Sequence, residues 1–117
     1  MSNDFAAAVF ASVKKIPAGH VCSYGAVAKD TGRPGAARAV GRILSKNTFT
    51  EANGYVGDEV VPCHRVTNTK GELTGHFGKT SFDALSTKRD LLAKEGVAFT
   101  KSGTVAPPCL SKHVKRN

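Results

Sequence analysis

Residues 23–45, which read SYGAVAKDTGRPGAARAVGRILS, decide the fold of this chain. Ser23 belongs to a residue type that caps helices, and it precedes a predicted short helix over residues 24–29. A Thr-Gly-Arg turn follows, and Pro34 suits the first turn of a predicted helix over residues 35–45. Two helices joined by a short glycine-containing turn are typical of a helix-turn-helix, although many helical domains contain such a pair.

The rest of the chain adds two helices and a small amount of β structure. The predicted elements are a helix from Ser2 or Asn3 to Pro17, a loop over 48–59, β-prone residues at 60–61 and 65–67, a turn at 68–71, a loop at 75–79 and a helix from Ser81 or Phe82 to Lys94 that Gly96 ends. We therefore expect a small α+β, mainly helical domain of winged-helix type over residues 1–100. A basic, loosely ordered tail is expected at 101–117.

Composition limits the classes of function. The chain has 117 residues, 40% of them hydrophobic, which is typical of one globular domain. It has no apolar run long enough to cross a bilayer and no signal peptide, so we expect an intracellular protein, nuclear in a eukaryote and cytoplasmic in a prokaryote. The net charge of +8 favours a polyanionic partner, nucleic acid rather than an anionic membrane. The plain alternative is a basic protein with a solvated surface.

The densest chemical signal is Pro62-Cys63-His64-Arg65-Val66. Cysteine reacts as the thiolate, so a nucleophilic Cys63 needs a base or a positive neighbour, and His64 and Arg65 offer both. Adjacent residues of a strand point to opposite faces, so a direct contact between Cys63 and His64 requires a bend, which Pro62 makes plausible. The alternative is an inert, buried cysteine beside a surface histidine. The three cysteines form no C-x-x-C pair, so neither a zinc site nor a disulfide is expected.

Four motifs in the same order resemble those of the O6-alkylguanine-DNA alkyltransferases, also called methylated-DNA–protein-cysteine methyltransferases. They are the Pro-Cys-His-Arg-Val run at 62–66, Ser-Tyr-Gly at 23–25, Ala-Ala-Arg-Ala-Val-Gly at 36–41, and Gly-Glu-Leu-Thr-Gly at 71–75 followed by Lys-Arg-Asp-Leu-Leu-Ala-Lys-Glu-Gly at 88–96. Each motif alone has modest specificity for the family, but the joint occurrence of all four over about residues 4 to 99 is highly specific.

The resemblance implies a suicide reaction that transfers an alkyl group from O6-alkylguanine in DNA to the protein. Cys63 is implied as the acceptor, His64 as the group that takes its proton through a water, and Glu95 as the carboxylate that holds His64. Asn47 is implied to brace the turn that carries the cysteine. Tyr24 is implied to press on the phosphate beside the damaged nucleotide and to assist departure of the guanine. No cofactor is implied.

The resemblance also implies how DNA is bound. Arg38 would enter the base stack where the damaged nucleotide flips out, because chemistry on a stacked base requires extrusion. The implied partner is double-stranded DNA, bound in the minor groove without sequence preference by a monomer. The further implied DNA-binding residues are Tyr24, Ala36, Ala37, Ala39, Gly41 and Arg65, and those of the lesion pocket are Leu73, Thr74, Gly75, His76 and Phe77.

Three departures from the family pattern leave alternatives open. The segment between Asn47 and Cys63 is about eight residues longer than usual. His76 replaces a common tyrosine, which affects the alkyl groups accepted. The resemblance begins almost at the start of the chain, so we expect the domain that precedes the catalytic domain in larger members to be absent, and with it any implied zinc. Small alkyltransferase-like proteins bind the lesion without transfer and flag it for excision repair, but carry Trp or Ala in place of the cysteine. A plain winged-helix DNA-binding protein is the third alternative.

Overall fold

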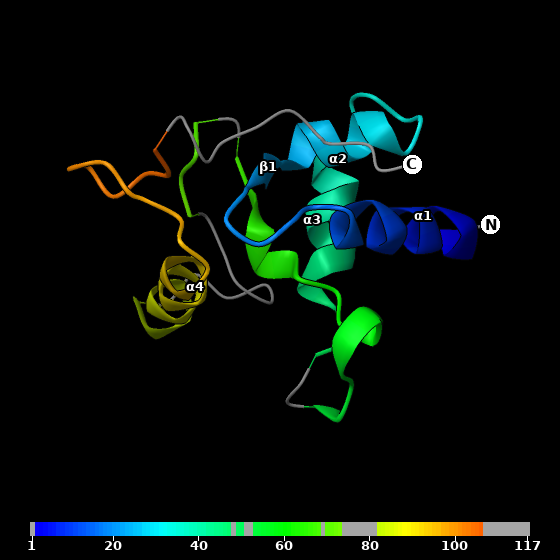
Figure 1. Ribbon diagram of the computed structural model, residues 1–117. Coiled ribbons are helices and arrows are strands. Elements are labelled where there is room, and N and C mark those ends of the chain that lie inside the picture. The colour runs from blue at the N-terminus through cyan, green and yellow to red at the C-terminus, as the bar shows by residue number, and fades with distance from the viewer. Residues whose placement is uncertain (1, 48, 51–52, 69, 74–81, 107–117) are drawn as a thin grey trace.

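The computed structural model describes residues 2–47, 49–50, 53–68, 70–73 and 82–106. Its elements are α1 (Ser2–Lys14), β1 (Cys22–Ser23), α2 (Tyr24–Asp30), α3 (Ala37–Ser45), the 3-10 helices η2 (Gly57–Glu59) and η3 (Cys63–Arg65), β2 (Val66–Thr67) and α4 (Phe82–Lys94). Helices α1, α2 and α3 pack together on one side, and α4 lies on the other side against η3 (Figure 1). The predicted mainly helical α+β fold is therefore confirmed.

The helix-turn-helix forms with one change at its second helix. The Oγ of Ser23 accepts a hydrogen bond from the amide of Ala26 at 3.0 Å, so the predicted N-cap is present. Helix α3 begins at Ala37, two residues later than predicted. Gly35 has φ of +97°, a left-handed conformation that cannot continue a helix, so Pro34 and Gly35 belong to the turn instead. The connection between α2 and α3 therefore covers residues 31–36, and the second helix is shorter than the sequence pattern suggested.

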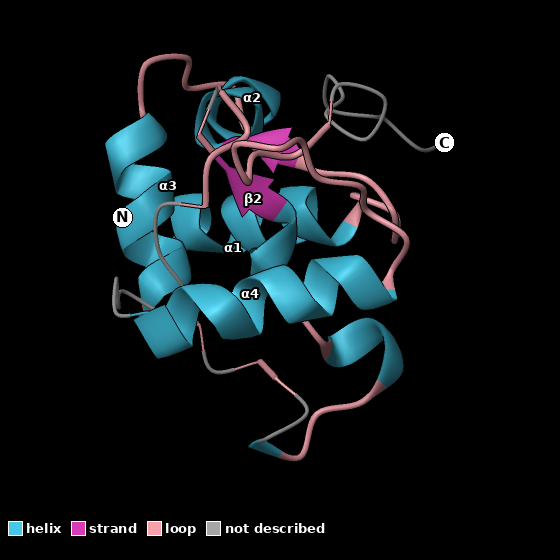
Figure 2. Cartoon of the chain, turned by 90° about the vertical axis from the view of Figure 1, so that its left-hand side faces the viewer, coloured by secondary structure: helices cyan, strands magenta, loops and turns pink. Residues whose placement is uncertain are grey.

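The β structure is smaller than predicted, and one of its two strands, β1, lies in a segment where the sequence predicted no strand. Strands β1 and β2 are parallel, with Cys22 beside Val66 and Ser23 beside Thr67. Figure 2 shows this pair above α4, between that helix and α2. The β-prone residues 60–61 lie outside both strands, and Arg65 belongs to η3. The pairing joins the start of α2 directly to the segment after the cysteine.

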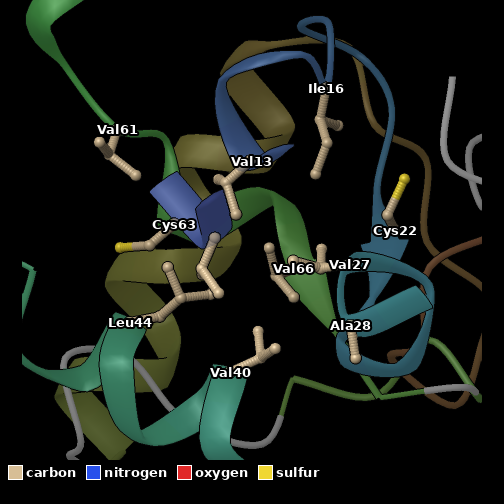
Figure 3. Close-up of a cluster of buried hydrophobic side chains, with 11 residues drawn as sticks. Val13, Ile16, Cys22, Val27, Ala28, Val40, Leu44, Val61, Cys63 and Val66 are labelled. Atoms are coloured by element: carbon tan, nitrogen blue, oxygen red, sulfur yellow. The ribbon is translucent and has the colours of Figure 1, made fainter. Parts of the chain in front are cut away.

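Two buried clusters hold the elements together. The larger contains Val9, Val13, Ile16, Cys22, Val27, Ala28, Val40, Leu44, Val61, Cys63 and Val66 (Figure 3). The smaller contains Val21, Leu92, Val97 and Val105. Since the amide of Val105 also donates to the carbonyl of Gly71 at 2.9 Å, packing continues past residue 100. None of the helices in the described ranges is long and apolar enough to cross a membrane.

Candidate active site

The turn at η3 places Cys63 at the edge of the larger cluster. Its amide donates to the carbonyl of Val61 at 2.8 Å, and the amide of Arg65 donates to that of Pro62 at 3.0 Å. Cys63 is 8% exposed, and Figure 3 shows Cys63 and Cys22 on opposite sides of the cluster. The bend expected from Pro62 is therefore a 3-10 turn, which removes the strand geometry that would separate Cys63 from His64.

Glu95 anchors the two residues that follow the cysteine. Its Oε2 lies 3.0 Å from Nε2 of His64 and accepts from Nη2 of Arg65 at 2.6 Å, while its Oε1 accepts from Nε of Arg65 at 2.9 Å. Nη1 of Arg65 donates to the carbonyl of Ile16 at 2.7 Å, which ties the pair to the end of α1. One carboxylate from the end of α4 thus fixes both side chains, in a bidentate arrangement that is among the stronger hydrogen-bond geometries.

The electrostatics of this trio favour a neutral histidine and a charged glutamate. Burial lowers the pKa of His64, and the bond to Glu95 only partly opposes this effect. Burial acts to raise the pKa of Glu95, but hydrogen bonds from Arg65 and His64 leave it below its usual value. An ionised carboxylate accepts a hydrogen from Nε2, so Nδ1 of His64 is left unprotonated and able to take a proton.

Cys63 itself is protonated at rest. Burial raises the pKa of its thiol, although a hydrogen bond with Asn47 and the charge of Lys88 both lower it in part. Burial also raises the pKa of Cys22, to about 11, with Asp30 adding to the effect. Both thiols are therefore poor nucleophiles until a base removes the proton, and only Cys63 has one next to it in the turn.

Asn47 reaches the cysteine turn in spite of the long segment that separates the two. It is 5% exposed, its Nδ2 donates to the carbonyl of Val61 at 3.0 Å, and its Oδ1 accepts from the amide of Phe49 at 2.9 Å. The amide of Val61 donates in turn to the carbonyl of Phe49 at 2.9 Å. These bonds close the base of the extra loop and keep the connection from Asn47 to the turn of Cys63.

Lys88 is a member of the site that the sequence analysis did not single out. It lies within one of the matching motifs, yet its side chain is 1% exposed, which is unusual for a lysine. Its Nζ donates to the carbonyl of Val66 at 2.7 Å and lies 5.9 Å from the ring centroid of Tyr24. Its charge also acts on Cys63 and His64. Helical spacing could have placed it on the same side of α4 as Leu92, four residues on.

The outer face of α3 is cationic. Arg38, Arg42 and Lys46 are all exposed and stand four residues apart, which puts them in one row along the helix. Ala36, Ala37 and Ala39 are all half-buried, and Ala36 also packs against the larger cluster. A Cβ built on Gly41 would meet the ring of Tyr24 at 3.9 Å. Gly41 therefore faces α2, so its small size serves the contact between the two helices.

The remaining predicted site residues divide into two groups. Arg65 does not join Arg38 on the outer face, because its guanidinium is engaged with Glu95 and Ile16, and we do not retain it as a DNA contact. Of the predicted lesion pocket only Leu73 lies within the described residues, where it borders a hollow of about 210 Å³ with Leu85, Ser86 and Arg89. Thr74, Gly75, His76 and Phe77 lie outside them.

The far side of the trio opens to solvent. His64, Arg65 and Glu95 line a cleft of about 520 Å³, whose other walls come from the end of α1, the segment from Gly57 to Pro62, and Leu91 of α4. Within the described ranges, no three His, Cys, Asp or Glu side chains gather as a metal site would require.

Taken together, the structure combines a helix-turn-helix that has a cationic outer helix with a buried Cys63, followed in its turn by a His64 that Glu95 holds. The comparisons agree: residues 4–97 match the family model described as 6-O-methylguanine DNA methyltransferase, DNA binding domain. The chain belongs to this family.

Curated relatives share the sequence over this region. A methylated-DNA–protein-cysteine methyltransferase from Mycolicibacterium paratuberculosis is 40% identical over 93 residues, which are 80% of this chain and 48% of that protein. One from Shigella flexneri is 40% identical over 88 residues, 75% of this chain and 44% of the relative. The chain thus spans about half the length of the curated relatives it matches.

Solved structures match the fold. Atl1 of S. pombe, in complex with damaged DNA containing O6-carboxymethylguanine, superposes with a TM-score of 0.68 at 30% identity, covering 94% of this chain and 96% of Atl1. The Mycobacterium tuberculosis protein OGT, in complex with DNA, superposes with a TM-score of 0.65 at 39% identity, covering 80% and 49%. Two relatives of this fold are therefore seen bound to DNA.

Proposed function

We propose that this protein repairs DNA by direct reversal, flipping out O6-alkylguanine and transferring the alkyl group irreversibly to Cys63. The single observation that carries the proposal is the set formed by Cys63, His64 and Glu95. A free thiol in a fixed turn stands next to a neutral histidine whose Nε2 is held 3.0 Å from a carboxylate. This is the arrangement that nucleophilic catalysis by a protonated thiol requires.

The reaction follows from these groups. The thiol of Cys63 gives its proton to Nδ1 of His64 through a water, and the carboxylate of Glu95 stabilises the imidazolium that results. Sulfur then attacks the alkyl carbon in line with the departing oxygen, so an S–C bond forms as the C–O bond breaks. The electron pair of that bond goes to the guanine, which recovers a ring proton that Tyr24 helps to deliver. The thioether is stable, so one molecule repairs one lesion.

DNA binding is assigned to the face of α3. Phosphates are met by cations, and Arg42 and Lys46 of the exposed row supply them. We propose that Arg38 fills the stack after the nucleotide leaves, that the half-buried Ala37 and Ala39 let α3 approach the minor groove, and that the protein acts as a monomer without sequence preference. The expected occupant of the pocket beside Leu73 is the flipped base.

A second function is favoured by the match to Atl1, because it covers 96% of Atl1, whereas the curated relatives described above match over about half of their length. A lesion-binding protein that transfers nothing would use the same α3 face and leave Cys63 unmodified. A duplex carrying tritium in the O6-methyl group separates the two functions, because only transfer moves the label to protein that has been digested free of DNA. Lesion binding is measured in parallel by fluorescence polarisation, with Cys63→Ser as the control for both.

If label appears on the wild-type protein and is absent from Cys63→Ser, direct reversal is supported. If both proteins prefer the damaged duplex and neither takes up label, the protein is a lesion-binding module. Equal affinity for damaged and undamaged duplexes, without transfer, would leave a general DNA-binding domain.

A further inference from the structure

After α4 the chain turns back on itself and forms a short hairpin (orange in Figure 1). Phe99 pairs with Val105 in an antiparallel bridge, and the amide of Ala106 donates to the carbonyl of Ala98 at 2.8 Å. A two-stranded ribbon is marginally stable on its own in water, so its order depends on what it packs against. The C-terminal hairpin, residues 98–106, is therefore fixed by its contacts with the rest of the domain.

The hairpin closes on the segment that follows β2. The amide of Val105 donates to the carbonyl of Gly71 at 2.9 Å. Val105 is buried in the smaller cluster, against which Leu73 and Phe99 also pack. Gly71 has φ of +79°, and a Cβ built there would lie 3.2 Å from the carbonyl oxygen of Val105. Glycine is the residue that combines this left-handed conformation with so close an approach of two backbones.

The same segment is tied to β2 on its other side. The Oδ1 of Asn68, which directly follows β2, accepts hydrogen bonds from the amides of Lys70 at 3.0 Å and Glu72 at 2.8 Å. The Nδ2 of Asn68 donates to Oε1 of Glu72 at 2.6 Å. The backbone of residues 71–73 is thus held between β2, which directly follows η3, and the C-terminal hairpin.

The hairpin also contacts a second wall of the hollow beside Leu73. The guanidinium of Arg89 lies 5.0 Å from the centroid of the Phe99 ring, in a cation–π contact. Arg89 and Leu73 both border the hollow of about 210 Å³, together with Leu85 and Ser86. Leu73 comes from the segment after β2, whereas Arg89 comes from α4. One hairpin therefore touches two walls that belong to separate parts of the chain.

We propose that the C-terminal hairpin is a positioning element for lesion binding, with Phe99 and Val105 as its positioning residues. Val105 holds the backbone that presents Leu73, and Phe99 holds Arg89 beside the hollow. Walls that are ordered before the flipped base arrives bind it more tightly, because less ordering has to accompany binding. This role rests on the proposed recognition of O6-alkylguanine, which both candidate functions share, and it does not depend on transfer to Cys63.

Two pairs of variants test the two contacts. Gly71→Ala adds a methyl group that must displace the backbone of Val105. Gly54→Ala is its control, because Gly54 also has a positive φ, of +92°, but a Cβ there meets nothing within 4 Å. Phe99→Leu removes the ring from Arg89 and keeps an apolar side chain, and Phe99→Tyr keeps the ring. Fluorescence polarisation measures the affinity of each protein for a duplex with one O6-methylguanine and for the same duplex without it.

We expect Gly71→Ala and Phe99→Leu to lower the ratio of the two affinities by about three- to tenfold and to leave the affinity for undamaged duplex at the wild-type value. Gly54→Ala and Phe99→Tyr should keep the wild-type ratio. Thermal melts of the same samples establish that each variant is folded. If Gly71→Ala does not fold, Phe99→Leu decides, since it changes one ring at a half-buried position.

An unchanged ratio in both folded variants would overturn the role of the hairpin. An equal loss of affinity for both duplexes would overturn it as well, because a hairpin that only stabilises the fold affects all binding alike. A wild-type protein without preference for the damaged duplex would instead overturn the proposed function, and the hairpin would then have no lesion to position.

Discussion

Glu95→Gln replaces one oxygen of the carboxylate with an NH2 group, and it tests whether Glu95 sets the tautomer of His64. The carboxylate accepts three hydrogen bonds, at 3.0 Å from His64 and at 2.9 and 2.6 Å from Arg65. A glutamine keeps the size and can still accept from Arg65 through its oxygen. Its NH2 then faces Nε2 of His64 and forces the tautomer that carries hydrogen on Nδ1. That tautomer cannot take the proton of Cys63, so the base is lost although the histidine remains.

The magnitude follows from the two effects of this change. General-base catalysis contributes about 10²–10⁴ in rate, and loss of the correct tautomer forfeits most of it, so we expect transfer to slow by about 10²–10³-fold. Arg65 also loses its counter-charge, and because the side chains are partly exposed we discount this to about 2 kcal/mol of stability. For a chain of this size that corresponds to a melting temperature lower by about 8 °C.

The pH dependence carries a sign that can be checked. Because Glu95 has a pKa below its ordinary 4.5, its contribution to folding is complete above that pH and is lost as the pH falls through the lowered value. The stability difference between the wild type and Glu95→Gln should therefore vanish in acid. Because the pKa of His64 is lowered from 6.5, the transfer rate should hold steady through pH 6.5 and decline only at lower pH.

The assay is single-turnover transfer from a duplex with one O6-methylguanine, at protein excess and several pH values, with thermal melts of the same samples. Asp90→Asn is the matched control, an acid-to-amide change at an exposed position of α4, and it should leave rate and stability unchanged. A Glu95→Gln protein that folds and transfers at the wild-type rate would refute the role of His64 as a base held by Glu95.

Three further changes test the brace and the DNA face. Asn47→Ala removes the bonds that close the loop on Val61 and should lower the free energy of unfolding by about 2–3 kcal/mol in denaturant titrations. Arg38→Ala should slow transfer by at least about tenfold at saturating protein while changing affinity for undamaged duplex little, since filling the stack matters only after flipping; equal repair rates would contradict its placement. Arg42→Gln with Lys46→Gln should reduce the slope of log affinity against log salt by about 2, equally for damaged and undamaged duplexes; an unchanged slope would remove that row from the interface.

Local signals in the sequence were sufficient to predict the four α-helices, with one start displaced by two residues, and to pick out the candidate site at residues 62–66. Ser23 caps α2 because its hydroxyl oxygen accepts a hydrogen bond from one of the free amides at the start of the helix. The last helix ends before Gly96, as predicted. The run at 62–66 drew attention to Cys63, which we propose as the nucleophile, and to His64 beside it, and the family pattern supplied Glu95, whose contact with His64 is confirmed. Each of these features depends on a few adjacent residues or on a motif, which is why reading along the chain finds them.

What reading along the chain missed depends on contacts between distant segments. The strand pairing of Cys22 with Val66 joins segments on either side of the helix-turn-helix. Each strand has only two residues, too few to show the alternation of apolar and polar residues that marks a strand in a sequence. The engagement of Arg65 by Glu95 and Ile16 could not be told from a phosphate contact, because the same guanidinium serves either. In the sequence, Lys88 could not be distinguished from the exposed lysines of the chain. Whether a lysine is buried depends on what α4 packs against, and the composition does not reveal that packing.

The central claim is that Cys63 accepts the alkyl group, and intact mass spectrometry tests it most directly. The protein is incubated with an excess of duplex carrying one O6-methylguanine per molecule, its mass is measured, and its peptides are mapped. The account predicts a gain of one methylene unit per protein, on Cys63 and at no other cysteine, that stops at one equivalent. An unchanged mass with the damaged duplex still bound in preference would contradict it and would make this protein a sensor of the lesion.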